Sequence, residues 1–455
     1  MEEELISMDT PSDMELIPGE LPEAALPAGE KSVTEHDAVT YLPNRVRTHE
    51  IALCLSGGGF RAALLHLGAM RRLNELGVLS KIETISSVSG GSIAAAYFAA
   101  HLDPWPSPGT IIETDKWNNL TQRFLEFTQK NRRTGPLLKR LWPPWNLIGK
   151  PSVSVEGLME TYKRHINGKT LRDLPDRPRF IFCAAELSYG VNWIFSKEAV
   201  GDYQVGYMRP APDWPIARAV AASSCFPPAF DPMPVPDDFK SAKLVDSNAR
   251  KNGDPNYKKN LSSLMLNDAG VYDNLGLEPV WKSHKIVLVS DGGATFDPDW
   301  DKGIVWRLSR PMRIMGNQST ALRKRWLMSN FIAHDLCPTN PYTLQGTYWG
   351  IGTPTARYGL KGQTPPAGYS PGSVSNFIAQ IRTDMDTFSD AEAQILENHG
   401  YLLADAAIRR YTPQLIEPHA RPLAVPYRAW FEGPDLDDRI KSALGSSGKV
   451  KVLGR

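Results

Sequence analysis

The sequence has few cysteines and no long apolar run, and each shortage excludes a class of protein. No stretch reaches the roughly 18 apolar residues of a membrane-spanning helix. The acidic N-terminus lacks the features of a secretory signal or transit peptide, so we expect a soluble cytoplasmic protein. The cysteines lie far apart without metal-ligand spacing, which predicts buried thiols in a reducing compartment. They are Cys54, Cys183, Cys225 and Cys337.

The net charge of +1 hides an uneven distribution. Residues 1–40 hold eleven acidic side chains and one base, Lys31, for a net charge of −10. Residues 41–455 therefore hold 50 bases and 39 acids, for a net charge of +11. The acidic composition predicts a disordered tail over residues 1–45. This tail either keeps the chain soluble or covers the basic surface of the body.

The first ordered segments predict an α/β fold. An apolar run at 51–55 is typical of a strand, and it ends at a glycine turn that leads into a helical pattern as far as Gly77. A second strand at 84–88 leads through another glycine turn into a helix at 93–100. This order predicts a βαβ unit with a parallel sheet, in which both turns lie at the carboxyl edge.

The remaining pattern favours one large domain with insertions over several domains. Further strands are predicted at 180–185, 193–196, 264–267 and 286–290, and further helices at 302–333 (interrupted at Pro311), 373–384 and 390–411. We therefore expect a domain over 46–411, with insertions near 103–177 and 235–260, and a C-terminal extension over 412–455.

Two glycine turns carry candidate chemistry. Gly57-Gly58-Gly59, followed by Phe60 and Arg61, can leave backbone N–H groups free for a phosphate or an oxyanion, although such turns also serve as simple tight connections. The second turn, at 87–91, places Ser89 between a strand and a helix, as in a nucleophile elbow. Gly91 allows close backbone approach there, whereas Ser87 stands where an elbow has its first glycine. Helix capping is the competing interpretation of Ser89.

A third segment offers a carboxylate at a strand end. Asp268, followed by Ala269, Gly270 and a loop with Asn274, comes directly after the predicted strand at 264–267. Asp291 follows the next predicted strand in the same manner. Local sequence does not choose between these two aspartates.

Taken in order, these segments resemble the patatin-like phospholipases, a family of lipid acyl hydrolases. The family's Gly-Gly-Gly-x-Arg loop corresponds to 57–61 and its Gly-x-Ser-x-Gly elbow to 87–91. Its Asp-Gly-Gly or Asp-Gly-Ala motif corresponds to 268–270, from which Ala269 departs, and its Ala-Ser-x-x-x-Pro stretch is similar to 222–227. The resemblance covers about 50–295. It implies a three-layer α/β fold, with a central, mainly parallel sheet flanked by helices.

The resemblance also implies a mechanism without histidine and without a metal or cofactor. Asp268 would accept the proton of Ser89, and Ser89 would attack a lipid ester to form an acyl-enzyme. The N–H groups of Gly57, Gly58 and Gly59 would bind the oxyanion. Supporting roles fall to Arg61, Gly91 and Gly270, with Arg61 either holding the loop or meeting a lipid phosphate. By this motif order Asp291 is not catalytic, and we expect His66 to be a core residue.

Basic and apolar residues occur together in two segments that could contact membrane lipid. Residues 130–150 combine six bases with Trp142 and Trp145, which suits either an anionic membrane surface or a lid with buried tryptophans. Residues 312–334 place methionines and leucine beside arginines, as in either an interfacial helix or a packed surface helix. The expected partners are a membrane phospholipid or other lipid ester and, transiently, a membrane surface; nucleic acid is not expected.

Two other classes of function have weaker support in the sequence. Gly57-x-Gly59-x-x-Ala62 matches a dinucleotide-binding fingerprint, but that fold needs an acid at the end of the second strand, where Ser89 stands instead. A non-catalytic scaffold with a hydrolase fold finds support only in the departures at Ser87 and Ala269.

Overall fold

The computed structural model describes residues 47–447, except 142–151, 228, 297, 299 and 302. The predicted disordered tail over 1–45 and the segment with Trp142 and Trp145 therefore lie outside the described residues. The description below concerns the compact unit to which residues 47–447 belong.

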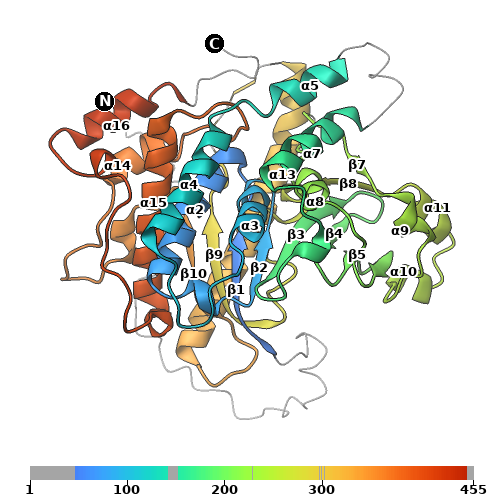
Figure 1. Cartoon of the computed structure of the whole chain (residues 1–455), viewed down its shortest axis with the longest axis horizontal. Coiled ribbons are helices and arrows are strands. Elements are labelled where there is room, and N and C mark those ends of the chain that lie inside the picture. Colours follow the sequence, from blue (N-terminus) through green and yellow to red (C-terminus); the bar gives the residue numbers. More distant parts are fainter. Residues whose placement is uncertain are drawn as a thin grey trace, which may run out of the picture. The chain divides into compact units, whose positions relative to one another are not determined.

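A ten-stranded sheet forms the centre of this unit, in the order β10-β9-β1-β2-β3-β4-β5-β6, with β8 paired to β3 and β7 to β8 (Figure 1). From β10 to β3 all neighbours are parallel, and the other pairs are antiparallel. The predicted mainly parallel sheet is thus confirmed. The strands are β1 (His49–Leu55), β2 (Thr84–Ser87), β3 (Arg179–Glu186), β4 (Val191–Phe195), β5 (Val200–Asp202), β6 (Gly206–Met208), β7 (Met233–Pro234), β8 (Met265–Asp268), β9 (His284–Asp291) and β10 (Gln345–Gly350).

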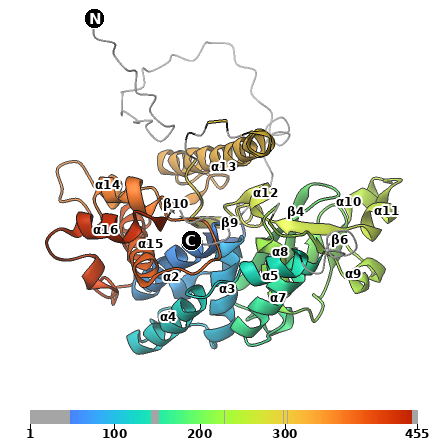
Figure 2. The ribbon, with the colours of Figure 1, turned by 90° about the horizontal axis from the view of Figure 1, so that it is seen from above.

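Helices cover both faces of the sheet. Figure 2 shows α2, α3, α4, α7 and α15 on one side and α12 and α13 on the other. No helix within the described ranges is both long and apolar enough to cross a bilayer. The helices are α2 (Gly59–Glu75), α3 (Gly90–His101), α4 (Thr114–Thr128), α5 (Thr134–Leu141), α7 (Val153–His165), α8 (Ile216–Ser224), α9 (Asp237–Ser241), α10 (Asn248–Lys251), α11 (Tyr257–Ser262), α12 (Gly270–Asp273), α13 (Ile304–Leu336), α14 (Pro371–Ser373), α15 (Asp390–Tyr411) and α16 (Leu436–Leu444).

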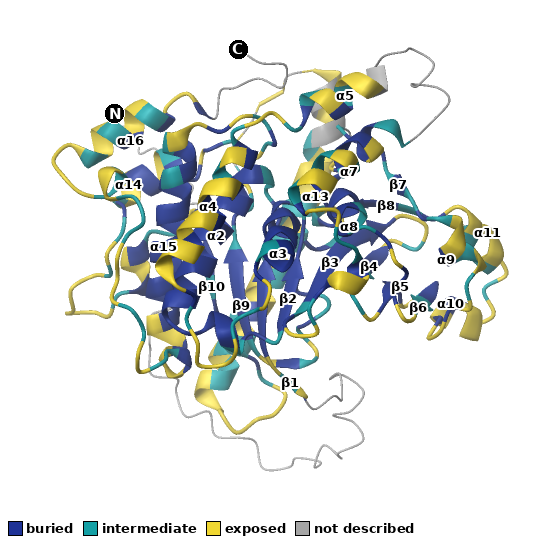
Figure 3. Ribbon diagram, in the orientation of Figure 1, coloured by how far each residue is buried: buried dark blue, intermediate teal, exposed yellow. Residues whose placement is uncertain are grey.

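The two faces bury different apolar cores. The larger core lies under α2, α3 and α15, where the helices are almost entirely buried (Figure 3). Ile440 and Leu444 of α16, from the C-terminal region, belong to this core. The smaller core joins Val287 and Val289 of β9 to Leu327 of α13. Among the α13 residues whose burial is described, Leu327 alone is fully buried.

Glycine allows α2 and α15 to cross at backbone contact. A Cβ atom at Gly68 would lie 1.8 Å from the carbonyl oxygen of Glu397, and one at Gly400 would lie 1.9 Å from that of Leu65. Side chains at these positions would force the helices apart. The crossing fixes α2, whose first residue, Gly59, belongs to the predicted oxyanion loop.

Three predictions about secondary structure and cysteines are wrong. Pro311 does not interrupt its helix: α13 continues from Ile304 to Leu336. Proline has no N–H group for the carbonyl of Arg307, four residues earlier, but Arg307 is exposed, so water can bind this carbonyl. The region 373–384 forms only α14 and one π-turn over Val374–Ile378. Cys337 is exposed, because it follows the last turn of α13, whereas the other three cysteines are buried as expected.

Candidate active site

Strands β2 and β8 meet end to end along the same edge of β3. Parallel β2 pairs with the first half of β3, so that Ser87 lies opposite Phe182. Antiparallel β8 pairs with the second half, so that Asp268 lies opposite Ala184. The chain leaves both strands at nearly the same point of β3. The predicted nucleophile and base therefore come together although about 180 residues separate them.

Ser89 occupies a strained turn between β2 and α3. Its φ of 49° and ψ of −115° lie outside the regions that residues with side chains favour. Gly91 makes the turn possible, because a Cβ atom there would lie 2.2 Å from the carbonyl oxygen of Leu55. The Gly91 N–H instead donates to the Ser56 carbonyl at 3.1 Å. Ser89 remains half-buried, so its hydroxyl has access to a ligand.

Asp268 is buried beside Ser89. The Gly270 N–H donates to Oδ1 of this carboxyl group at 2.7 Å. Burial raises the pKa of Asp268 to about 7, although this hydrogen bond and the neighbouring Ser89 side chain act in the opposite direction. A carboxylate with a pKa near neutrality can take up a proton and release it again at physiological pH, as a general base must.

The glycine loop lies against the serine turn. A Cβ atom at Gly57 would lie 3.2 Å from Cβ of Ser89, and one at Gly90 would lie 2.1 Å from the carbonyl oxygen of Gly59. Gly58 and Gly59 have φ values of 143° and 58°, which favour glycine. Within the described residues, neither of their N–H groups has a protein acceptor, whereas the Gly57 N–H donates to the Asn274 carbonyl at 3.1 Å. The free donors of the loop are thus those of Gly58 and Gly59.

Arg61 holds segments that are far apart in the sequence. Its buried guanidinium donates to the carbonyl of Gly292 at 3.0 and 3.2 Å, and to the carbonyls of Ala379 and Ile381 at 3.1 and 2.7 Å. Of the two roles weighed for Arg61, these contacts favour support of the glycine loop over contact with a lipid phosphate.

A serine network supports the elbow from helix α8. The hydroxyl of Ser223 accepts a hydrogen bond from the Ser89 N–H at 2.9 Å and bonds the hydroxyl of Ser92 at 2.9 Å. Ser92 in turn donates to Ser87 at 3.1 Å. Sequence reasoning noticed the stretch at 222–227 but assigned Ser223 no role, because only the fold brings α8 to the elbow.

The segment before α15 also supports the glycine loop, and the sequence contains no signal for this contact. The Phe60 N–H donates to the Asp384 carbonyl at 2.9 Å, and a Cβ atom at Gly59 would lie 2.7 Å from that oxygen. The Asp384 carboxylate is paired with Arg133. Arg133 also contacts Asp386 at 3.1 Å, and Arg132 stacks on Phe127, so two bases of the predicted membrane segment have partners within the protein.

Both sequence departures from the family motifs fit the structure. The hydroxyl of Ser87 donates to the Ile181 carbonyl at 3.2 Å, so the larger residue is accommodated within the sheet. Ala269 has helical dihedral angles (φ −63°, ψ −24°), which require no glycine, and its methyl group packs with Val88 and Cys183.

The competing acid and base candidates are occupied elsewhere. Asp291 accepts hydrogen bonds from the Tyr348 hydroxyl at 2.6 Å and from the Gly293 N–H at 2.8 Å. His66 bonds Ser290 and the Ser56 carbonyl, and burial lowers its pKa to about 4, so it is a neutral core residue, as expected. Glu83 accepts a hydrogen bond from the Glu50 N–H at the amino end of β2, away from the turn at Ser89.

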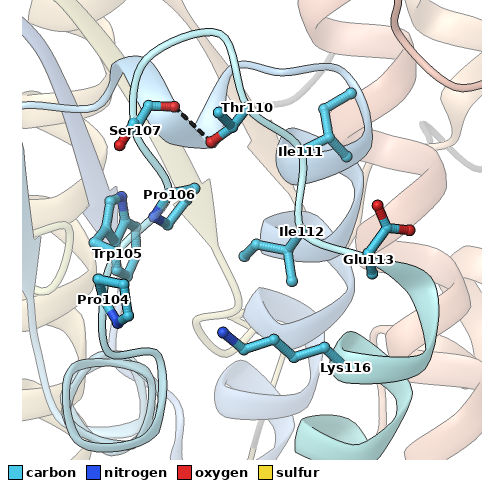
Figure 4. Close-up of a pocket in the computed structure, with 9 residues that line it drawn as sticks. All are labelled: Pro104, Trp105, Pro106, Ser107, Thr110, Ile111, Ile112, Glu113 and Lys116. Atoms are coloured by element: carbon cyan, nitrogen blue, oxygen red, sulfur yellow. Dashed lines mark hydrogen bonds between the residues drawn. The ribbon is translucent and has the colours of Figure 1, made fainter.

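A separate hollow of about 310 Å³ lies between α3 and α4, lined by Trp105, Ile112 and Lys116 among others (Figure 4). The loop that lines it carries a hydrogen bond from the Thr110 hydroxyl to the Ser107 carbonyl at 2.6 Å. Twelve-residue α3 separates this loop from Ser89 by about 18 Å. The hollow is therefore not part of the Ser89 site.

Comparison with known proteins agrees with this geometry. A family model described as Patatin-like phospholipase matches residues 53–281, a span that includes the glycine loop, Ser89 and Asp268. No curated protein matches the sequence.

Solved structures show a distant likeness to this chain. The chain is similar to human GIVD cytosolic phospholipase A2 in complex with methyl gamma-linolenyl fluorophosphonate, at 12% identity and a TM-score of 0.41, over 82% of this chain and 60% of that one. It is also similar to VipD from Legionella pneumophila, at 13% identity and a TM-score of 0.30, over 77% of this chain and 67% of that one. The chain thus spans less than two thirds of the human protein.

Proposed function

Because the chain belongs to the patatin-like phospholipase family, we propose that it is a lipid acyl hydrolase that cleaves carboxylic esters through Ser89 and Asp268. Family membership supports lipid hydrolase activity in general. The observation that carries the specific assignment is the placement of the strained Ser89 beside the buried carboxyl group of Asp268, where β2 and β8 end on the same edge of β3.

The proposed reaction begins with transfer of the Ser89 hydroxyl proton to Asp268. The serine oxygen then bonds the ester carbonyl carbon, and the N–H groups of Gly58 and Gly59 stabilise the negative charge on the carbonyl oxygen. Collapse of this intermediate breaks the ester C–O bond, and Asp268 returns the proton to the departing alcohol. A water molecule then gives its proton to Asp268, attacks the acyl-serine and releases the fatty acid, after which the proton returns to Ser89.

Labelling and product analysis together test this proposal. A fluorophosphonate probe should modify wild type at Ser89, and mixed phospholipid vesicles should yield free fatty acid by mass spectrometry. Ser89→Ala should abolish both signals, and Asp268→Asn should lower turnover by about 10⁴-fold, the loss typical of a missing catalytic residue.

Asp291→Asn is the matched control, since it alters a carboxylate at the end of the neighbouring strand β9. It should retain most of the turnover. Full hydrolysis by Ser89→Ala or Asp268→Asn would contradict the assignment. A folded wild type that neither reacts with the probe nor releases fatty acid would instead favour a non-catalytic scaffold.

A further inference from the structure

Helix α13 presents large apolar side chains to solvent. Met312, Met315 and Leu322 are exposed to 62%, 64% and 59%, respectively. Residues on the opposite side of the helix, Leu327 and Phe331, pack on the sheet, so the helix has one covered and one uncovered side. Soluble proteins seldom leave several apolar side chains exposed along one element unless it contacts a partner or a membrane. Ile304, Ile314, Ile332 and Leu336 are also exposed along the helix.

The same helix is strongly basic. Six bases and one acid, Asp335, lie between residues 304 and 336, for a net charge of +5. Arg325 is exposed beside Leu322, and Lys324 lies 4.3 Å from the ring centre of Tyr348. Exposed apolar side chains flanked by bases are typical of helices that lie in the interface of anionic membranes.

Helix α13 begins at the same edge of the sheet as the candidate site. It connects the parallel strands β9 and β10, so it starts at the carboxyl edge of the sheet, where Ser89 lies, and runs back towards the amino edge (Figure 1). Its 33 residues span about 50 Å, whereas eight-residue β9 spans about 26 Å. The excess length allows one end of the helix to extend past the sheet.

Contacts with α12 show which end this is. The Ser319 hydroxyl bonds the Tyr272 carbonyl at 3.4 Å, and Arg323 lies 3.5 Å from the Asp273 carboxylate. Both partners belong to the short helix that follows Asp268, at the level of the candidate site. The first fifteen residues of α13, with Met312 and Met315, precede these contacts and therefore extend beyond the carboxyl edge.

We propose that residues 312–325 of α13 dock the protein on an anionic lipid surface. Met312, Met315 and Leu322 enter the interface, and the exposed Arg325 meets a lipid phosphate. The inference rests on the proposed function, because it places the site next to the membrane that supplies its substrate. Charge favours lipid over a second copy of the chain, since self-association through this face would bring two helices of net charge +5 together.

Vesicle binding of the full chain tests the proposal, with Ser89→Ala as background to prevent lipid turnover. Phosphatidylcholine vesicles with phosphatidylserine should sediment more protein than pure phosphatidylcholine vesicles, and added salt should lower the bound amount. Met315→Glu combined with Leu322→Glu should lower the partition coefficient by at least about tenfold, because two apolar side chains leave the interface. Arg325→Gln should lower it by about fivefold.

Leu423→Glu serves as the matched control, because Leu423 is exposed to 37% and lies close to Arg421, which bonds the C-terminal end of α2 at the amino edge of the sheet. It should bind as the background does, and thermal unfolding should show all variants folded. Undiminished vesicle binding of the double variant would overturn the proposal. So would a background protein that forms a dimer and binds no vesicles, if the double substitution dissociates that dimer. Vesicle binding without fluorophosphonate labelling of wild type would refute only the hydrolase, and labelling without binding would refute only the docking surface.

Discussion

The backbone N–H of Ser89 donates to the hydroxyl of Ser223 at 2.9 Å, so helix α8 holds the proposed nucleophile by its main chain. This contact leaves the Ser89 hydroxyl free for Asp268. Because Ser89 has a φ of 49°, the turn is costly to maintain, and a bond to its N–H favours the strained conformation. Ser223 is therefore a positioning residue within the proposed mechanism.

Ser223→Ala should lower kcat by about fivefold and leave KM within about twofold, because one hydrogen bond of about 1 kcal/mol that orients the nucleophile is lost. The rate of fluorophosphonate labelling should fall by the same factor. Ser223→Thr should restore both values, since it keeps the hydroxyl.

Ser224→Ala is the neighbouring control. The Ser224 hydroxyl bonds the Val220 carbonyl and Tyr162 instead of the elbow, so its loss should lower thermal stability with little effect on kcat. A wild-type labelling rate in Ser223→Ala would show that the contact is not needed to position Ser89.

Asp268 should make the folded protein less stable as the pH rises from about 4 to about 7. The folded state keeps the Asp268 proton up to a pKa of about 7, whereas the unfolded chain releases it near the ordinary aspartate pKa of 3.8. The folded state thus binds more protons in this window, and stability falls by roughly 4 kcal/mol across it. Asp268→Asn removes this cost, so at pH 8 the variant should unfold at higher denaturant concentration than wild type.

Burial raises the pKa of Glu397 to about 7 as well, so Glu397 also makes stability depend on pH. Both proteins contain Glu397, and the difference between their free energies of unfolding therefore isolates the effect of Asp268. This difference should be small below pH 4 and largest above pH 7. The same pKa should appear in the kinetics. If ionised Asp268 is the general base, kcat/KM of wild type should rise with pH and level off above about 7. Equal stability of the two proteins at pH 8 would show that Asp268 is not held in an unfavourable charged state.

Arg61→Lys should destabilise the fold by about 3 kcal/mol and slow the hydrolysis of all esters alike. Lysine cannot reproduce the bonds that the guanidinium makes to the carbonyls of Gly292 and Ile381. Chemical denaturation gives the stability, and a monomeric ester without phosphate is compared with a phospholipid. Arg177→Lys, at an exposed position, should change neither quantity. A loss confined to the phospholipid would instead assign Arg61 to phosphate recognition.

Much of the sheet was predictable because its parallel half consists of local units. Periodicity and glycine turns predict β1, α2, β2 and α3, and the predicted strands at 180–185 and 286–290 correspond to β3 and β9. Ser89 and Asp268 became candidates because each directly follows a predicted strand, but only the order of the family's motifs favours Asp268 over Asp291.

The supports of the site were not predictable, because they come from distant parts of the chain. Nothing in the neighbourhood of Asp384 indicates that its carbonyl binds the Phe60 N–H at 2.9 Å. The antiparallel course of β8 depends on its pairing with β3, about 80 residues earlier.

The pairing of β2 and β8 along β3 has a consequence for how this protein can diversify. The distance between Ser89 and Asp268 depends on the register of two strands with β3. These strands are β2, which pairs over Thr84–Ser87, and β8, which pairs over Leu266–Asp268. The exposed helices α9 to α11 lie between β7 and β8, after Ser223 of α8 in the sequence. Residues can therefore be inserted or deleted there, and the surface remodelled for new lipids, while the reacting groups keep their spacing.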